Sequence, residues 1–104
     1  MPSNENIIQD AICQYLTLKR YFFWRSNTTG LYDPKTQGFR RMPKYAIAGV
    51  PDIIIISDGF FIGLEVKDKG KQSDNQKTFE ENCTKAGGVY AVVRSVDDVI
   101  ALGL

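Results

Sequence analysis

The 104-residue sequence has no histidine and only two cysteines, and these gaps exclude several kinds of chemistry. Cys13 and Cys83 each fall on a predicted helix, without the spacing of a metal-binding pair. A zinc site, or a nucleophile activated by histidine, is therefore close to excluded. The polar start of the chain lacks a targeting pattern, and its 43% apolar and 24% charged residues are ordinary for a globular domain. We expect a single intracellular domain over residues 1–104, with no membrane association.

The net charge of +1 conceals a basic segment beside an acidic remainder. Residues 19–45 carry a net charge of +6 and the rest of the chain carries −5. Much of the basic segment is a predicted loop over residues 28–48, in which aromatic residues alternate with basic ones. This composition is typical of a surface that binds phosphates and stacks on bases. Two alternatives stay open, namely a solvated surface loop and an arm that packs on a second subunit. The basic residues are Lys19, Arg20, Arg25, Lys35, Arg40, Arg41 and Lys44.

The hydrophobic periodicity predicts an α/β fold in which strands are covered on both faces. We expect a helix from residue 3 or 4 to about 18 and a strand over 21–27. A hairpin of two strands follows the long loop. A helix opened by a capping box at Ser73 should run to about Ala86 and precede a strand over 89–94. Ser95 and Asp98 should cap a short closing helix.

The hairpin carries the strongest functional signal. Asp58-Gly59 between two apolar runs predicts a two-residue loop, and that register places Asp52 directly across from Glu65. Opposed residues share a face, and Lys67 points the same way. Two opposed carboxylates repel unless a cation lies between them, so the pattern predicts a site for a hard divalent ion. The alternative is a plain ion pair of Lys67 with one of the acids.

Three further residues are candidates, each with a simpler explanation. Glu5 lies on or beside the apolar stripe of the first helix, although an acid in a first turn is also favoured by the helix dipole. Gln76 leads the inward face of the second long helix, unless it only completes the capping box. Arg94 ends a strand where a phosphate could lie, but it is equally well a surface arginine. We expect Trp24 and the phenylalanines to belong to the core.

The order of elements, together with Pro51-Asp52 and Glu65-x-Lys67, resembles the PD-(D/E)xK nuclease superfamily, and more closely its VRR-Nuc family. The resemblance spans nearly the whole chain. One departure is that Ser95 stands where the family's Val-Arg-Arg motif has its last arginine. The residues that carry the resemblance are Glu5, Arg25, Asn27, Gly49-Val50-Pro51-Asp52, Gly63-Leu64-Glu65-Val66-Lys67, Ser73, Gln76 and Val93-Arg94.

The resemblance implies a mixed central sheet with helices on both faces, in the order αβββαβα, and an Mg²⁺- or Mn²⁺-dependent endonuclease. It implies metal ligation by Asp52, Glu65 and the Val66 carbonyl, with Glu5 binding directly or through water. Lys67 would orient or deprotonate the attacking water or stabilise the transition state, and Gln76 would orient Lys67 or the water. The residues expected to bind DNA are Arg25, Lys35, Arg40, Arg41, Lys44 and Arg94.

The chain also resembles the small stand-alone members of this family. These are viral and bacterial enzymes that act as homodimers on branched DNA, four-way junctions especially, in DNA repair. The resemblance therefore implies a Holliday-junction resolvase in the cytoplasm of a bacterium or a virus-infected cell, without a nucleotide cofactor. Two alternatives stay open. One is a nuclease for flaps or single strands, and the other is a non-catalytic DNA-binding module that has kept the nuclease fold.

Overall fold

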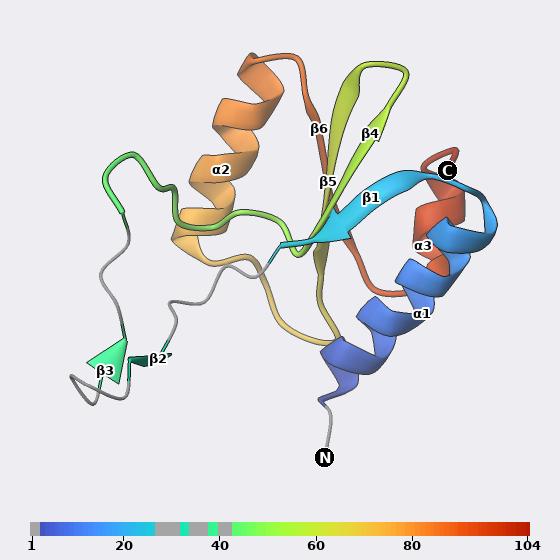
Figure 1. Ribbon diagram of the computed structural model, residues 1–104, viewed down its shortest axis with the longest axis horizontal. Helices are drawn as coiled ribbons and strands as arrows, with labels where there is room; N and C mark the ends of the chain where they lie inside the picture. Colours follow the sequence, from blue (N-terminus) through green and yellow to red (C-terminus); the bar gives the residue numbers. More distant parts are fainter. Residues whose placement is uncertain (1–2, 27–31, 34–37, 40–42) are drawn as a thin grey trace.

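The computed structural model of the chain describes residues 3–26, 32–33, 38–39 and 43–104 (Figure 1). The expected α/β class is confirmed. Two short strands, β2 and β3, occur where the sequence predicts only loop, because strands of two residues are too short to show alternation. The elements are α1 (Asn4–Leu18), β1 (Phe22–Arg25), β2 (Tyr32–Asp33), β3 (Gly38–Phe39), β4 (Ile53–Ser57), β5 (Phe60–Val66), α2 (Asp74–Lys85), β6 (Val89–Val93) and α3 (Val96–Ala101).

The central sheet has four strands in the order β1-β4-β5-β6. The pairs β1–β4 and β4–β5 are antiparallel, whereas β5 and β6 are parallel. Parallel neighbours need a crossover connection, and α2 supplies it between β5 and β6. The strands β2 and β3 form a separate antiparallel pair.

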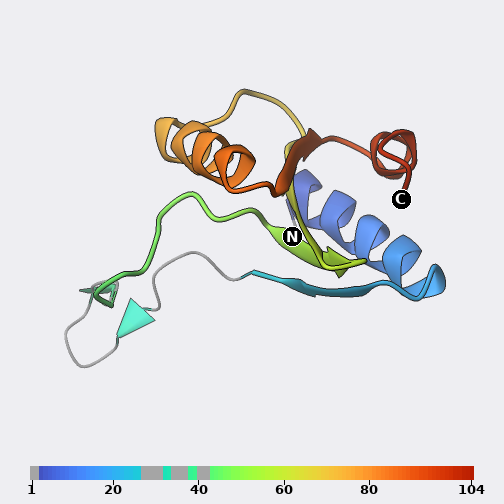
Figure 2. The ribbon, with the colours of Figure 1, turned by 90° about the horizontal axis from the view of Figure 1, so that it is seen from above.

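The helices lie on opposite faces of this sheet, with α1 and α3 on one side and α2 on the other (Figure 2). The core lies between the sheet and the α1–α3 layer, and this burial is what stabilises the domain. No described helix is long and apolar enough to cross a bilayer. The fully buried core residues are Ile12, Leu16, Ile53, Ile55, Leu64, Val66, Val93 and Val99.

Serine side chains cap all three described helices, as local sequence signals predict. Ser3 accepts from the Asn6 amide at 3.1 Å, and Ser95 accepts from the Asp98 amide at 3.1 Å. At α2, Ser73 and Gln76 form the predicted capping box. Each cap satisfies backbone amides that have no partner inside the helix, which fixes where the helix begins.

The hairpin has the predicted register. Ser57 pairs with Phe60 and Ile53 pairs with Leu64, so the loop consists of Asp58 and Gly59 alone. Their φ angles of 52° and 81° are the positive values that a type I′ turn requires. The next pair along this register is Asp52 with Glu65.

Candidate active site

The Asp52 carboxylate lies beside the end of β5. Its Oδ2 accepts a 2.8 Å hydrogen bond from the Val66 amide, and its backbone carbonyl accepts one of 2.8 Å from Ser26. Asp52 thus connects the beginning of β4 to the ends of both neighbouring strands. The side chain is held in place before any ligand binds.

Glu65 is buried, with only 4% of its surface exposed. Its Oε1 accepts a 2.5 Å hydrogen bond from Nε2 of Gln76 on α2. Its Oε2 is also buried and meets no hydrogen-bond donor among the described residues. A buried carboxylate oxygen without a donor is costly, so this atom is the position where a cation or a proton would have the largest effect.

Gln76 holds Glu65 in a fixed orientation. The Oε1 of Gln76 accepts from the Ser73 amide at 2.8 Å, which leaves its NH₂ group to face Glu65. The sequence predicts that Gln76 orients Lys67 or water. The hydrogen bond described here goes to Glu65 instead, so Gln76 both completes the capping box and positions the carboxylate.

The surroundings of Glu65 favour its neutral form. Burial, followed by the charge of Asp52, raises the pKa of Glu65 to about 8, although the charge of Lys67 opposes this rise. The charge of Glu5 also contributes to the raised pKa of Glu65. Two neighbouring carboxylates repel each other unless one of them holds a proton. Without that proton, the pair needs a positive charge.

These features fit a hard divalent cation. The described residues contain no group of three or more His, Cys, Asp or Glu side chains placed to hold a metal, so Glu5 does not complete such a group. Two carboxylates with a backbone carbonyl suit Mg²⁺, which retains several waters. The pairing of β4 with β5 ends at Ile53 and Leu64, and the Val66 amide beyond it donates to the Asp52 carboxylate. The Val66 carbonyl belongs to the same residue and is the third ligand that the family resemblance implies.

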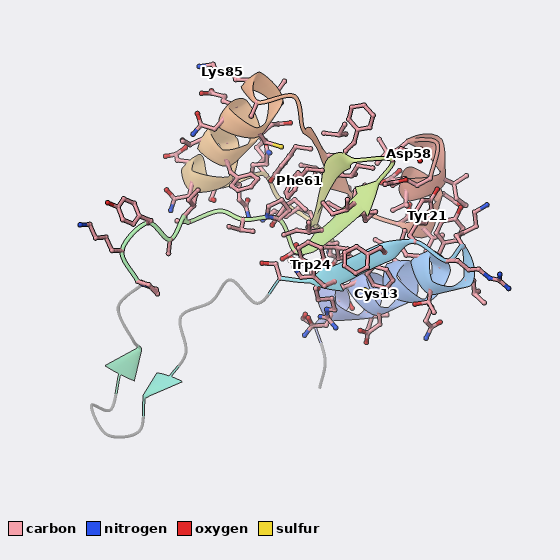
Figure 3. The ribbon with its side chains drawn as sticks, turned by 45° about the horizontal axis from the view of Figure 1, so that its top comes forward. Cys13, Tyr21, Trp24, Asp58, Phe61 and Lys85 are labelled. Atoms are coloured by element: carbon pink, nitrogen blue, oxygen red, sulfur yellow. The ribbon has the colours of Figure 1, made fainter. Side chains whose placement is uncertain are left out.

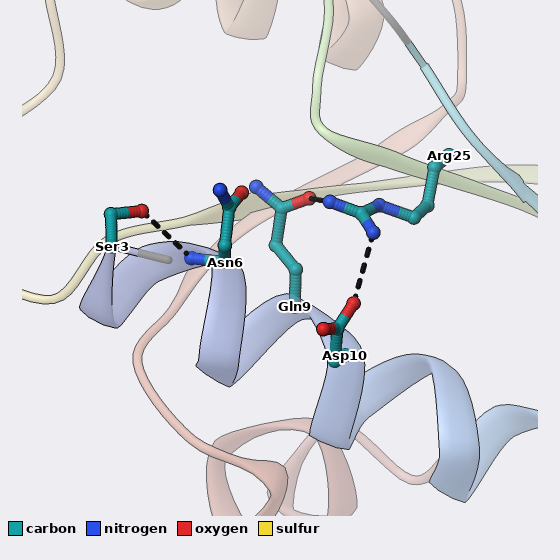
Figure 4. Close-up of polar contacts among 5 residues, drawn as sticks. All are labelled: Ser3, Asn6, Gln9, Asp10 and Arg25. Carbon is teal, nitrogen blue, oxygen red and sulfur yellow. Dashed lines mark hydrogen bonds and ion pairs between the residues drawn. The ribbon is translucent and has the colours of Figure 1, made fainter. Parts of the chain in front are cut away.

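The expected DNA-binding residues have varied surroundings. Arg25 donates to Gln9 and to Asp10, each at 2.9 Å, and so links β1 to α1 (Figure 4). Arg94 donates to the carbonyls of Asp68 at 3.4 Å and Gly70 at 2.9 Å. Lys44 is exposed, with its Nζ 5.2 Å from the centre of the Tyr45 ring. Lys35, Arg40 and Arg41 lie outside the described residues.

Sequence reasoning missed the role of Gly49. Its φ is +81°, and a Cβ at this position would lie 2.4 Å from the Asn75 carbonyl oxygen. The segment before Asp52 therefore lies directly against the first turn of α2, which carries Gln76. The signal was present in the Gly-Val-Pro-Asp motif, because a glycine this close to a site residue often marks a close backbone approach.

The prediction that Trp24 and the phenylalanines belong to the core is wrong for Phe22, Trp24 and Phe60, the last of which lies at the tip of the hairpin. Phe22 and Trp24 are 68% and 43% exposed. Phe23, which points to the opposite face of β1, does pack against the core. Alternation places Phe22 and Trp24 on the α2 side of the sheet, where α2 does not extend over β1.

Neither a protein-family model nor a curated protein sequence matches the chain. A solved structure described as a VRR_NUC domain does match it, with a TM-score of 0.67 and 20% sequence identity. The match covers 97% of this chain and 95% of the other. The chain therefore has the fold of a VRR_NUC domain, as the sequence resemblance predicts.

Proposed function

We propose that the chain is a metal-dependent nuclease of the VRR-Nuc family that cuts phosphodiester bonds in DNA. The observation that carries the proposal is the pair formed by Asp52 and Glu65, whose buried Oε2 meets no donor among the described residues. A shared VRR_NUC fold supports the same reading. Cleavage of a phosphodiester builds up negative charge, which positive charge at the site must stabilise. A pair of carboxylates cannot supply that positive charge, but a metal ion bound by the pair can.

Asp52, Glu65 and the Val66 carbonyl would hold Mg²⁺ or Mn²⁺, and Glu5 would contribute through a water, because it does not complete a group of three acids with them. The ion would polarise the phosphate and stabilise charge on the leaving oxygen. Gln76 keeps one oxygen of Glu65 engaged, so the other stays directed at the ion. Lys67 lies close enough to lower the pKa of Glu65, and its ammonium group would orient the attacking water or stabilise the transition state.

The substrate that we propose is branched DNA, above all the four-way junction, cut by a homodimer during DNA repair in a bacterial or virus-infected cell. A two-fold dimer presents two equivalent sites, which suits two symmetric cuts. Arg25, Lys35, Arg40, Arg41, Lys44 and Arg94 would contact the phosphates. Their positive charge would make binding weaken steeply with salt.

The test is a cleavage assay on labelled four-way junctions, flaps, nicked duplexes, linear duplexes and single strands, with Mg²⁺, Mn²⁺ or EDTA. We expect metal-dependent cutting of the junction into two nicked duplexes. Glu65→Gln and Lys67→Ala should each lower the rate at least 100-fold. The matched controls are Glu81→Gln and Lys77→Ala, which make the same changes at exposed positions on α2.

Other outcomes of this assay identify the alternatives. Cutting confined to flaps or single strands would replace the junction by that substrate. Normal DNA binding without cutting of any substrate, and without any effect of Glu65→Gln on binding, would overturn the nuclease and leave a DNA-binding module.

A further inference from the structure

The described residues cover one face of the central sheet over only half of its width. On the α2 side, Phe79 of α2 packs against Phe61 of β5 at 6.3 Å and Tyr90 of β6 at 6.1 Å between ring centroids. Over β1 and β4, this face instead exposes Phe22 and Trp24, together with 37% of Ile56. Trp24 and Phe61 are labelled in Figure 3. The uncovered half therefore presents an aromatic surface to the solvent.

Phe22 and Trp24 form one continuous platform. Their ring centroids are 5.7 Å apart and their planes are tilted by 54°. Both residues pair across β1–β4 with isoleucines, Phe22 with Ile56 and Trp24 with Ile54. We call these two side chains the β1 platform.

The β1 platform lies next to the carboxylate pair and on the same face. Trp24 is opposite Ile54, which is two residues along the chain from Asp52, a distance of about 7 Å along a strand. The hydrogen bond from the Ser26 amide to the Asp52 carbonyl keeps the two strands together up to the site. Any nucleotide chain with a phosphate at Asp52 and Glu65 would thus have a neighbouring base within reach of Trp24.

We propose that the β1 platform stacks on an unpaired base next to the phosphate that is cut. This inference rests on the proposed function and names the feature of the substrate that the site would select. Every base has an apolar π-face that stacks on exposed aromatic rings, and a base within a duplex already has both faces covered. The β1 platform therefore favours DNA with a base free of its partner beside the cut, as at a flap or a bulge.

A second copy of the chain is a poorer occupant for this surface. A stable protein interface buries about 800 Å² on each partner. Two aromatic side chains supply about 150–250 Å² each when completely buried, and part of each is already covered in this chain. The β1 platform is thus the size of one or two bases rather than of a dimer interface. A homodimer would need additional surface elsewhere.

The experiment uses Trp24 as its own reporter, because it is the single tryptophan in the sequence. The full chain is titrated in EDTA and low salt with a duplex that carries one unpaired thymidine, and with the same duplex carrying an abasic residue at that position. We expect the thymidine to quench the fluorescence of Trp24 and to bind at least 5-fold more tightly than the abasic duplex. Equal quenching and equal affinity would overturn the proposal.

Variants test the same point without relying on fluorescence. Phe22→Leu and Trp24→Leu keep the apolar bulk but lose the aromatic face, and each should remove most of the preference for the thymidine duplex, measured by anisotropy of labelled DNA. The matched control is Phe60→Leu, because Phe60 is 58% exposed at the tip of the hairpin and pairs with Ser57, away from the carboxylates. Circular dichroism would verify that each variant is folded, and an unchanged preference in folded Trp24→Leu would contradict the proposal.

Two outcomes separate this proposal from its alternatives. A two-chain mass that is lost in Phe22→Leu would show that a second copy covers the β1 platform, and this would overturn base stacking. Metal-dependent cleavage is measured in parallel on the same duplexes and on the full panel of junctions, flaps, duplexes and single strands. Base-dependent quenching without cleavage of any of these substrates would support the β1 platform and contradict the nuclease. Cleavage without base-dependent quenching would support the nuclease and contradict the β1 platform.

Discussion

At the scale of single residues, the carboxylate of Glu65 is the group of the site whose ionisation the surroundings oppose most. It is buried, it lies close to the charge of Asp52, and its second oxygen has no donor within the described part of the chain. Each of these conditions opposes ionisation. The protein thus keeps a proton at a position where it would exchange that proton for a cation.

The raised pKa of Glu65 predicts how the stability of the metal-free protein depends on pH. Between about pH 4.5 and 8, the folded state holds a proton on Glu65 that the unfolded state has released. The contribution of Glu65 is therefore complete below about pH 4.5 and is lost as the pH rises through about 8. We expect the free energy of unfolding of the wild type, relative to Glu65→Gln, to fall by up to about 1.4 kcal/mol per pH unit in this window.

Urea unfolding in EDTA at several pH values would measure this difference. Mg²⁺ should reduce the slope, because the ion stabilises the carboxylate that the proton otherwise neutralises. The prediction fails if Glu65→Gln and the wild type have the same pH profile.

Gln76 should affect catalysis more than folding. Gln76→Glu keeps an oxygen to accept from the Ser73 amide, but it replaces the donor to Glu65 by a third negative charge. Loss of a partner that orients a metal ligand typically costs 10–100-fold in activity or metal affinity. We expect a loss of about that size in the cleavage rate, with a thermal midpoint within a few degrees of the wild type.

The matched variant for Gln76 is Ser73→Ala, which removes the cap and keeps the glutamine. It should cost about 1 kcal/mol of stability and leave most of the cleavage rate. A larger catalytic loss in Ser73→Ala than in Gln76→Glu would contradict the positioning role.

At the scale of elements, the site depends on how the segment before β4 packs against α2. Gly49 brings its backbone against Asn75 and Gln76, so the carboxylate of Asp52 and the amide of Gln76 are positioned by one contact between two elements. Gly63 is similarly close to Pro51, with a Cβ position 2.5 Å from its Cγ. The segment that leads to Asp52 thus packs closely at two positions where only a glycine leaves enough space.

Gly49→Ala should destabilise the protein strongly. The new Cβ would clash with backbone atoms that cannot move without shifting α2, and the positive φ adds strain. We expect a loss of about 2–4 kcal/mol in urea unfolding. Gly70→Ala is the matched control, because Gly70 also has a positive φ of 89° but no heavy atom within 4 Å of its Cβ position. Similar losses in the two variants would mean that the close approach has no energetic weight.

Local signals in the sequence predicted most of these elements, and long-range packing accounts for what they missed. The turn at Asp58-Gly59 and the caps at Ser3, Ser73 and Ser95 each depend on interactions within a few residues, so they can be read directly. The exposure of Trp24 depends instead on how far α2 extends over the sheet. The partners of Arg94 lie in a loop more than 20 residues away. Neither the exposure of Trp24 nor the partners of Arg94 can be predicted from the neighbouring residues in the sequence.

At the scale of the whole molecule, the proposed homodimer predicts a two-chain mass and a distinct cleavage product from mixed dimers. Sedimentation should give the mass of two chains. Dimers that combine one wild-type and one Glu65→Gln subunit should nick the four-way junction on one strand without resolving it, because each subunit would cut one strand. Differently tagged subunits allow the mixed dimer to be isolated. Complete resolution by the mixed dimer would contradict two independent sites.

The hairpin between the two acids makes length, rather than composition, the constrained property of residues 52–65. Its tip is open, since a Cβ at Gly59 would meet no heavy atom within 4 Å. The positive φ angles of Asp58 and Gly59 nevertheless favour glycine, asparagine and aspartate at these two positions. Inserting one residue within β5, between Phe60 and Glu65, would instead turn the side chains that follow it to the opposite face of the sheet and place Glu65 in the hydrophobic core. Related chains should therefore keep the same number of strand residues between the turn and each acid.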